Sequence, residues 1–396
     1  MRLFSIADFR RLWLIGFTFS VVRWLETLAL ALYAYQLTAS AFVVAMLTML
    51  RLLPMGLFGA FFGAASERFD RRRVLILVVA VQTTVSLTLA VLASFDAIAI
   101  WHLASASFIN GTGWATDHPV RRMMIGDSVG AERVGTALSL DTASNNGTRV
   151  LGPVLSGVLL AHFGIVSVFC FSIALYVPSL FAAIHIGMRR EGSHARALSF
   201  FSSIREGLAW ARNDRGLMGV FLITIIYNIF GWPATSMVPV IGTDALRLGP
   251  EGVGLLAACD GVGGLVGALL VAGRARPAYY GRLYVGAVAM YLVMVVLFAA
   301  SPVAPAAGLA LLLGGTSGAA FAVMQATLVY RSAPVHMRAR LLGVISVCIG
   351  TGPIGFLYLG WLAEILTPAI ATMALAAQGL VVMAATRRYW RPTLRL

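Results

Sequence analysis

Residues 63–73 read GAASERFDRRR, a short and densely charged block in an otherwise apolar chain. The block lies between two apolar runs, at roughly 41–64 and 74–94. Apolar runs of about 20 residues predict helices that cross a membrane, so the block is expected to form a tight loop between two spans. Two interpretations are open: an arginine-rich anchor that fixes the membrane topology, and a gating loop of a transporter.

The composition is that of an integral membrane protein. Of the 396 residues, 59% are hydrophobic and 12% are charged, and the mean hydropathy is +0.87, whereas a soluble domain averages about 25% charged residues. All 30 basic residues are arginine, and the net charge is +14. Nearly all of the arginines lie in short loops between apolar runs, so contact with anionic lipid headgroups explains the charge and nucleic acid is not expected as a partner.

Twelve apolar runs, separated by arginine-rich or Gly/Pro breaks, are expected to be membrane spans. Arginines gather at both termini and in the even-numbered loops, which predicts that the termini and these loops are cytoplasmic. The expected fold is therefore an all-α membrane protein of two six-helix halves. The expected spans are 11–36, 41–64, 74–94, 97–120, 134–161, 165–188, 216–242, 252–273, 281–300, 304–330, 339–363 and 367–386.

The two halves are predicted to be copies of one six-helix unit. The N-terminal half is expected at 1–188 and the C-terminal half at 216–396, joined by a cytoplasmic linker at 189–215 that can form a short amphipathic helix. Gly152-Pro153 of the fifth span matches Gly352-Pro353 of the eleventh at an offset of about 200 residues, a pattern typical of internal repeats in transporters.

Seven polar side chains inside the expected spans are candidate functional residues, because a charge at the centre of a span costs about 2.5–3.5 kcal/mol on insertion scales. Three arginines and three carboxylates form a balanced set that can pair in a water-filled cavity and relay protons; the alternative is a set of fixed salt bridges between helices. Glu26 is the preferred protonation site, because a buried carboxyl group can load and release a proton. The set is Arg23, Glu26, Arg51, Asp141, Asn145, Arg149 and Asp260.

The fifth span also carries small residues and a proline that predict close packing with other helices: Gly147, Gly152, Pro153 and Gly157. No metal site is expected, because the histidines and cysteines are scattered without ligand spacing. The sequence has no glycine-rich phosphate loop followed by Lys-Ser/Thr, so ATP-driven transport is not expected. The chain is expected not to be an enzyme and to need no cofactor, with a proton gradient as its energy source.

The opening block resembles the loop 2–3 signature of the major facilitator superfamily. That signature runs glycine, three residues, an acid, a basic residue, then a glycine and two basic residues; here the matching residues are Gly63, Glu67, Arg68, Asp70, Arg71 and Arg72. The chain departs from it at Glu67, where aspartate is usual, and at Asp70, where glycine is common. The Asp70 departure resembles the branch of drug, macrolide and siderophore exporters. The stretch from Leu140 to Asn146, followed by Gly152-Pro153, is also similar to that branch. The Gly-Pro element resembles the antiporter motif of exporters in the superfamily.

The resemblance implies a rocker-switch secondary transporter with a central cavity between its halves. The six matching residues would form a cytoplasmic gate together with Asp117 and Arg121 of the fourth span, and Glu67 and Arg71 would lock against the eleventh span in the outward-facing state. The implied function is proton-coupled antiport that exports amphipathic small molecules, drug-like or siderophore-like. Import of a siderophore or another anionic metabolite, and lipid flipping, are alternatives on the same fold.

The expected setting of the protein follows from the same resemblance and from the arginine pattern. We expect a multi-pass protein of the bacterial inner membrane that acts as a monomer. Its expected partners are a small-molecule substrate and the surrounding membrane lipids.

Overall fold

The computed structural model describes residues 3–68, 70–130, 132–187 and 200–396, with side chains described in these ranges except at 57–68, 200–203 and 339. Throughout the described ranges the regular structure is helical and includes no strand. The all-α prediction is therefore confirmed for this part of the chain. The gating role predicted for Gly63, Glu67 and Arg68 concerns side chains that lie outside the described residues.

The chain divides into two compact units, each of which is described by itself. Unit 1 comprises Met1–Leu37, Leu50–Ala197 and Gly249–Gly254, and unit 2 comprises Thr38–Met49, Leu198–Leu248 and Leu255–Leu396. The predicted boundaries of the two six-helix halves stay a prediction.

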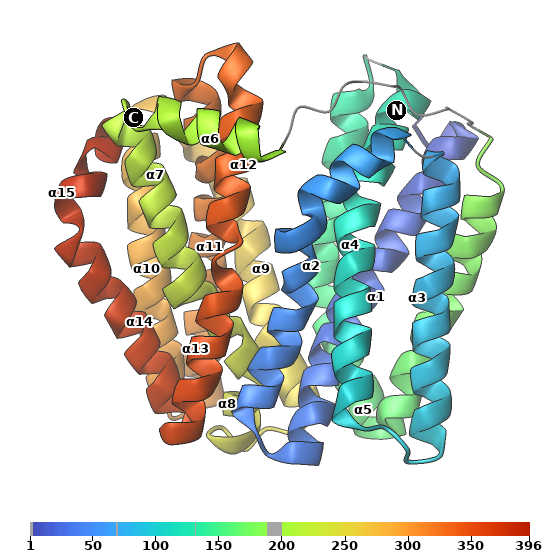
Figure 1. Ribbon diagram of the computed structural model, residues 1–396. Helices are drawn as coiled ribbons and strands as arrows, with labels where there is room; N and C mark the ends of the chain where they lie inside the picture. The colour runs from blue at the N-terminus through green and yellow to red at the C-terminus, as the bar shows by residue number, and fades with distance from the viewer. Residues whose placement is uncertain (1–2, 69, 131, 188–199) are drawn as a thin grey trace. The chain divides into compact units, whose positions relative to one another are not determined.

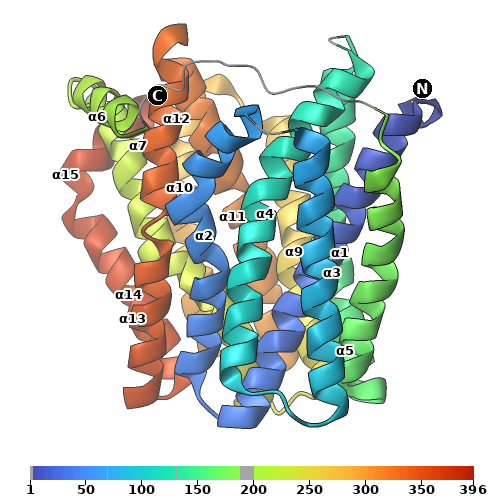
Figure 2. The ribbon, with the colours of Figure 1, turned by 45° about the vertical axis from the view of Figure 1, so that its right-hand side comes forward.

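Long helices build unit 1 within its described residues. Helix α3 lies beside α4 and α5 (Figure 1, Figure 2). Buried apolar side chains from α1, α3, α4 and α5 form a core that includes Phe9, Leu75 and Ile125. The bounds are a 3-10 helix (Leu3–Ser5), α1 (Ala7–Thr38), α2 (Ala41–Arg68), α3 (Arg71–Ser94), α4 (Ile100–Val129) and α5 (Val134–Ile184); the part of α2 up to Met49 belongs to unit 2.

The helices of unit 2 are shorter and more often interrupted. Helix α10 packs against α11 and α14, and its Tyr284 and Leu292 belong to a large buried core. The bounds are α6 (Phe200–Ala211), α7 (Arg215–Ile226), a π-helix (Tyr227–Gly231), a 3-10 helix (Trp232–Met237), α8 (Val238–Asp244), α9 (Pro250–Arg274), a 3-10 helix (Pro277–Tyr279), α10 (Tyr280–Ala300), α11 (Ala304–Ser332), α12 (Val335–Ile349), α13 (Gly352–Ile365), α14 (Pro368–Ala385), α15 (Arg387–Trp390) and a 3-10 helix (Arg391–Arg395).

Nine helical segments in the described residues are long and apolar enough to cross a membrane. One of them, α5, has 51 residues, and Gly164 within it has a non-helical backbone with φ 72°, so that two helices meet there. Helix α2 contributes only a shorter apolar stretch, Ala41–Gly56, to the segments searched. The multi-pass membrane character is thus confirmed.

Two expected spans are not continuous α-helices. The span expected at 216–242 changes from α-helix to π-helix, then to 3-10 helix, and then to the α-helix α8. Pro233 stands near the start of the 3-10 helix and Pro239 near the start of α8. The span expected at 339–363 is divided between α12 and α13, and Pro353 stands in the first turn of α13. Proline has no N–H to donate to the preceding turn, and this explains why the regular ladder stops at these places.

The amphipathic helix expected in the linker is present as α6. It lies along α12 (Figure 1), and its Leu208 and Trp210 pack against a core cluster that includes Leu341 and Val344. A Cβ at Gly207 would lie 3.1 Å from the Arg340 carbonyl oxygen, so α6 and α12 approach closely here.

The glycines of α5 differ in what surrounds them. A Cβ at Gly152 would collide with Trp24 and lie 2.9 Å from the Leu25 nitrogen on α1, and a Cβ at Gly157 would lie 3.0 Å from the Glu251 Cα. Around Gly147 no described atom lies within 4 Å of the Cβ position. Of the predicted packing glycines, Gly152 and Gly157 make close contacts, and the expectation for Gly147 is wrong because that face of α5 meets open space.

We expect Gly152→Ala to destabilise the protein and Gly147→Ala to stabilise it slightly. Forcing a methyl group into the contact between α5 and α1 costs about 1–3 kcal/mol, whereas alanine at an uncrowded helical site stabilises by about 0.5–1 kcal/mol. Thermal unfolding of the two purified variants in detergent measures the difference. Equal melting temperatures for the two variants would contradict the close packing at Gly152.

Candidate functional site

Unit 1 contains a cavity whose lining is mostly polar. The cavity holds about 430 Å³ of space that atoms do not fill, open solvent included. It is lined by side chains from α1 to α5, and three of the seven candidates of the buried polar set are among them. The lining residues are Phe19, Ser20, Arg23, Arg51, Gln82, Asn110, Trp114, Asp117, His118, Arg121, Asn145 and Tyr176.

Glu26 lies beside this cavity and is held by neutral hydrogen-bond donors. Its side chain is 1% exposed, and its two carboxylate oxygens accept hydrogen bonds from Ser86 Oγ of α3 and Asn110 Nδ2 of α4, each at 2.9 Å. Among the described residues no basic group lies within ion-pair distance of this carboxylate. Its charge is therefore not fixed by a salt bridge.

Arg51 is nearly buried and only partly hydrogen-bonded. Its Nη2 donates to the carbonyl oxygen of Arg23 at 2.9 Å, whereas its Nη1 has no acceptor among the described residues. Helix α4 can approach this point because it carries Gly111, where a Cβ would lie 3.1 Å from the Arg51 Cα. Pro54 follows within α2, and a proline inside a helix frees a carbonyl of the preceding turn and distorts the helix.

Arg23 is held by an amide and by aromatic rings. Its Nη2 donates to Asn145 Oδ1 at 2.6 Å, and its Nε has no acceptor in the described part of the chain. The guanidinium carbon lies 4.7 Å from the ring centroid of Trp114 and 5.0 Å from that of Trp24, distances at which cations are attracted to aromatic faces. Arg149 lies over the same Trp24 ring, at 5.1 Å.

A second polar group of unit 1 is a true ion-pair cluster. Arg121 of α4 lies 3.2 Å from Asp117 Oδ2, one turn away on the same helix, and also pairs with Asp141 of α5. All three side chains are at least nine-tenths buried. Gly16 makes room for the guanidinium on the α1 side, since a Cβ there would lie 2.9 Å from Arg121 Nε.

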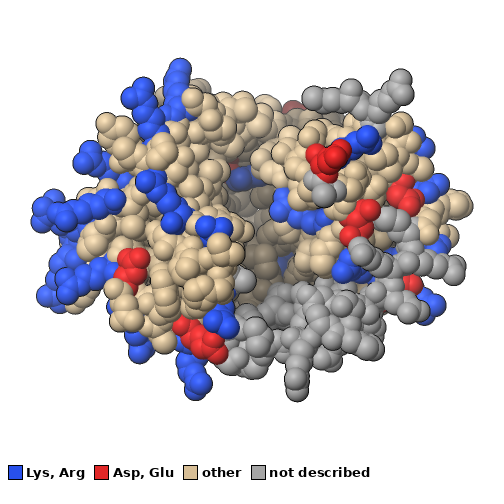
Figure 3. Space-filling view, turned by 90° about the horizontal axis from the view of Figure 1, so that it is seen from above, with Lys and Arg blue, Asp and Glu red and all other residues tan. Residues whose placement is uncertain are grey.

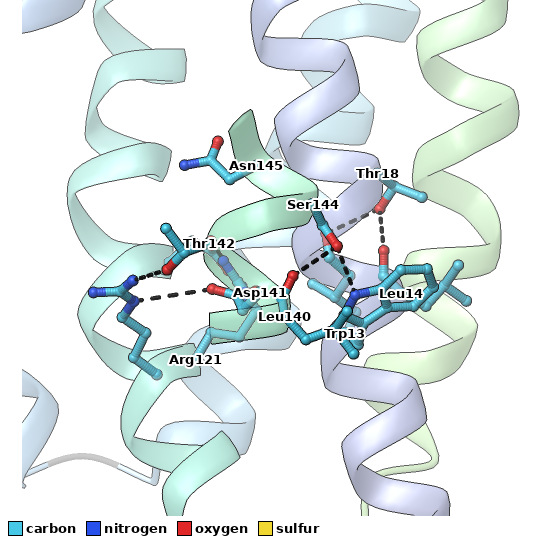
Figure 4. Close-up of polar contacts among 12 residues, drawn as sticks. Trp13, Leu14, Thr18, Arg121, Leu140, Asp141, Thr142, Ser144 and Asn145 are labelled. Carbon is cyan, nitrogen blue, oxygen red and sulfur yellow. Dashed lines mark hydrogen bonds and ion pairs between the residues drawn. The ribbon is translucent and has the colours of Figure 1, made fainter. Parts of the chain in front are cut away.

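Two further contacts join α1 to α5 next to this cluster. Trp13 Nε1 donates to Ser144 Oγ at 2.9 Å, and the hydroxyls of Thr18 and Ser179 lie 2.6 Å apart. In Figure 4, Ser144 points from α5 toward Trp13 of α1, while Asp141 points from the same helix toward α4. One helix therefore supplies both a neutral contact to α1 and a charged contact to α4.

The described residues of the opening block are tied to unit 1. Asp70 caps α3, because its carboxylate accepts from the backbone nitrogens of Arg72 at 2.9 Å and Arg73 at 3.4 Å; aspartate at this position stabilises a helix start. Arg71 pairs with Asp127 of α4 at 2.9 Å, and Arg72 donates to the carbonyl of Ile184. The gating role predicted for these residues stays a prediction.

The predicted pairing of the buried charges is wrong in one respect. The sequence suggests that Asp141 balances Arg23, Arg51 or Arg149, but its carboxylate pairs with Arg121. Spacing along α5 cannot reveal this partner, since it lies on another helix. Asp260 lines a separate cavity inside unit 2, beside Tyr291 and Thr235.

Sequence reasoning missed several residues that line the cavity of unit 1. Gln82, His118 and Tyr176 lie there with Phe19 and Ser20. His118 follows directly after Asp117 in the sequence, but it does not share the helical spacing of four residues that relates Asp117 to Arg121. In the residues that the structure describes, no group of His, Cys, Asp and Glu could hold a metal ion.

We expect Arg121→Gln to lower the free energy of unfolding by about 3–5 kcal/mol, because it leaves two buried carboxylates without their cation. Arg122→Gln is the matched control: the Arg122 side chain is 37% exposed and lies 3.9 Å from Asp141, and a partly exposed pair contributes about 0–1 kcal/mol. Chemical or thermal unfolding in detergent compares the two. Similar losses for both variants would show that the buried cluster is not what stabilises this region.

Comparison with known proteins agrees with the fold and the multi-pass character. The family model of transmembrane secretion effectors matches residues 3–394. Macrolide efflux protein A of Streptococcus pyogenes is 21% identical over 62% of this chain, and the match spans 61% of that protein, less than two thirds of its length. The staphyloferrin A transporter of Staphylococcus aureus is 22% identical over 69% of this chain and 68% of its own length.

Solved structures support the fold alone, because their sequence identities are low. A point mutant of the nucleoside transporter NupG has a TM-score of 0.79 at 10% identity, and the match covers 97% of this chain and 100% of that one. The human organic anion transporter MFSD10 has a TM-score of 0.63 at 15% identity, with 96% and 97% covered. The predicted family is confirmed, and the chain belongs to the transmembrane secretion effector family of the major facilitator superfamily.

Proposed function

We propose that this chain is a proton-coupled secondary active transporter of amphipathic small molecules in the bacterial inner membrane, working by rocker-switch alternating access. It would act as a monomer with twelve spans and with both termini in the cytoplasm. The observation that carries the proposal is the Glu26 carboxyl: buried inside a membrane-spanning helix, hydrogen-bonded to the neutral donors Ser86 and Asn110, and next to a polar cavity.

The topology rests on helix lengths and on the distribution of arginine. Dividing α5 at Gly164 and adding α2 and α4 to the nine apolar segments gives the twelve spans that the sequence predicts. Figure 3 looks onto the face where the C-terminus of unit 2 lies, and arginine side chains gather on that unit's part of it. Exposed arginines of unit 2 at helix ends include Arg212, Arg274, Arg282 and Arg388, and the positive-inside rule assigns such a face to the cytoplasm.

Proton coupling follows from the surroundings of Glu26. A buried carboxyl group without an ion-pair partner among the described residues is costly to keep ionised in a low-dielectric interior, and Ser86 and Asn110 can hydrogen-bond to it in either protonation state. Proton exchange at Glu26 would then depend on what occupies the adjacent cavity. A buried charge inside a span is a functional site by default, with such a proton relay among its usual roles.

Export by antiport is the first candidate for the direction of transport. Macrolide efflux protein A is a relative whose name states an efflux function. In helix α5, Gly152 and Gly157 allow close contacts on either side of the Pro153 region, with α1 and with the start of α9. Close contacts without bulky side chains let helices shift against each other during alternating access.

Import of an anionic metabolite is the second candidate, and a specific observation favours it. Arg23 and Arg51 both line the cavity, and within the described residues neither lies within ion-pair distance of a carboxylate. A cavity with two such guanidiniums suits an anion better than a cation. The staphyloferrin A transporter, a relative, is named for a siderophore.

We expect Glu26→Gln to abolish proton-coupled flux while the protein still folds, because the glutamine amide can keep hydrogen bonds to Ser86 and Asn110 but cannot exchange a proton. The test uses proteoliposomes with an imposed pH gradient and two labelled probes, a macrolide and 2-naphthoate. A macrolide moving opposite to the proton flux supports export by antiport, and 2-naphthoate moving with the protons supports import.

Glu251→Gln is the matched control for this measurement. Glu251 is half-exposed and pairs with His162 at 2.6 Å, so its loss is not expected to change proton-coupled flux. Gradient-driven flux in Glu26→Gln equal to that of the unmodified protein would exclude Glu26 as the proton site. Transfer of lipid that depends on the headgroup, with no transport of either probe, would point to a lipid flippase.

A further inference from the structure

We propose that Arg51 and Arg23 bind the carboxylate of an amphipathic aromatic acid, whose ring lies against Trp114 in the cavity of unit 1. The role of this site in binding a substrate rests on the proposed transport function, whereas the binding of the acid does not. It follows from two buried guanidinium donors that lack acceptors among the described residues, from the lack of a described carboxylate within ion-pair distance of either arginine, and from the aromatic rings that line the same cavity.

Two buried donors without acceptors belong to arginines that line the cavity of unit 1: Arg51 Nη1 and Arg23 Nε. A third, Trp24 Nε1, belongs to the residue next to Arg23 and is not part of the cavity lining. Arg51 also donates to the Arg23 backbone, so the two arginines meet at one turn of α1. Nearly all buried polar groups in folded proteins have a partner, so two unpaired guanidinium donors in one cavity indicate an acceptor that the described residues do not supply.

The missing acceptor is expected to carry a negative charge. Arg51 is only 7% exposed, and arginine does not relieve burial by losing its proton. The nearby carboxylates are engaged elsewhere: Glu26 with Ser86 and Asn110, and Asp117 and Asp141 with Arg121. The rings of Trp24 and Trp114 and the Asn145 oxygen offset part of the charge of Arg23. Arg51 has one hydrogen-bond acceptor among the described residues, the Arg23 carbonyl oxygen, and interacts with the Glu26 carboxyl only from beyond ion-pair distance.

The geometry favours a carboxylate attached to a ring. A guanidinium presents its N–H groups in a planar fork that matches the two oxygens of a carboxylate. Trp114, Phe19 and Tyr176 line the same cavity as the two arginines, and aromatic side chains there can pack against a ring of the ligand in offset or edge-to-face arrangements. A small inorganic anion would satisfy the charge but would leave these rings without a partner.

The test compares 2-naphthoate with its neutral analogue of the same shape, 2-naphthamide, by calorimetric titration of the full-length protein in detergent. We expect the carboxylate to bind about ten- to hundredfold more tightly, the difference that a charged hydrogen-bond partner usually makes. Arg51→Gln should remove this preference. Arg51→Lys, which keeps the charge but not the fork, should reduce it while leaving 2-naphthamide binding unchanged.

The control is Arg11→Gln, which removes an arginine from the same helix as Arg23. Arg11 pairs with Asp8 at 2.9 Å and is partly exposed, so the preference for the carboxylate should be unchanged. Equal affinities for 2-naphthoate and 2-naphthamide in the unmodified protein would overturn the inference without any variant. So would an unchanged preference in folded Arg51→Gln protein.

Measurements of binding and of transport distinguish the proposed anion site from the proposed transport function. Proton-coupled flux of a macrolide without any preference for the carboxylate would refute the anion site and leave the transport function standing. Tight, Arg51-dependent binding of 2-naphthoate without flux of either probe under a pH gradient would establish the anion site and refute the transport function.

Discussion

Helix α1 carries Arg23 and Glu26 three residues apart, on one face, and yet the two side chains form no ion pair. Glu26 is held by Ser86 and Asn110, and Arg23 is held by Asn145 and two indole rings. If the two side chains formed an ion pair, each charge would be neutralised by the other. Neither group would then favour binding of a proton or an anion. Their separate partners leave both charges able to respond to the contents of the cavity.

The Arg121 cluster makes this separation possible. Asp117 and Asp141 are the other buried carboxylates near the cavity, and both are bound to Arg121. Neither of them lies within ion-pair distance of Arg23 or Arg51. Buried ion pairs contribute little net stability but are costly to break, so the cluster is best understood as a rigid support: it joins α4 to α5 while the neighbouring arginines remain available.

Most of the fold could be predicted from apolar runs and arginine-rich loops, because membrane spans need length and hydropathy and little else. The buried polar residues on α1, α2 and α5 could be found for the same reason, since each is an exception inside an apolar run. Their partners could not be predicted. Helical spacing relates Asp141 to Asn145 on one helix, but the contact of Asp141 with Arg121 depends on how α4 packs against α5. The interruption after Ile226 could have been read from Pro233 and Pro239.

An anion held by Arg51 would lie near the Glu26 carboxyl, with which Arg51 interacts electrostatically. Two negative charges repel strongly in a low-dielectric interior, so the anion and a proton on Glu26 should bind together. The most direct test adds 2-naphthoate, adjusted to the same pH, to weakly buffered protein in detergent and follows a pH indicator. We expect proton uptake by the unmodified protein and none by Glu26→Gln. Proton release, or equal uptake in the variant, would contradict the coupling of the two sites.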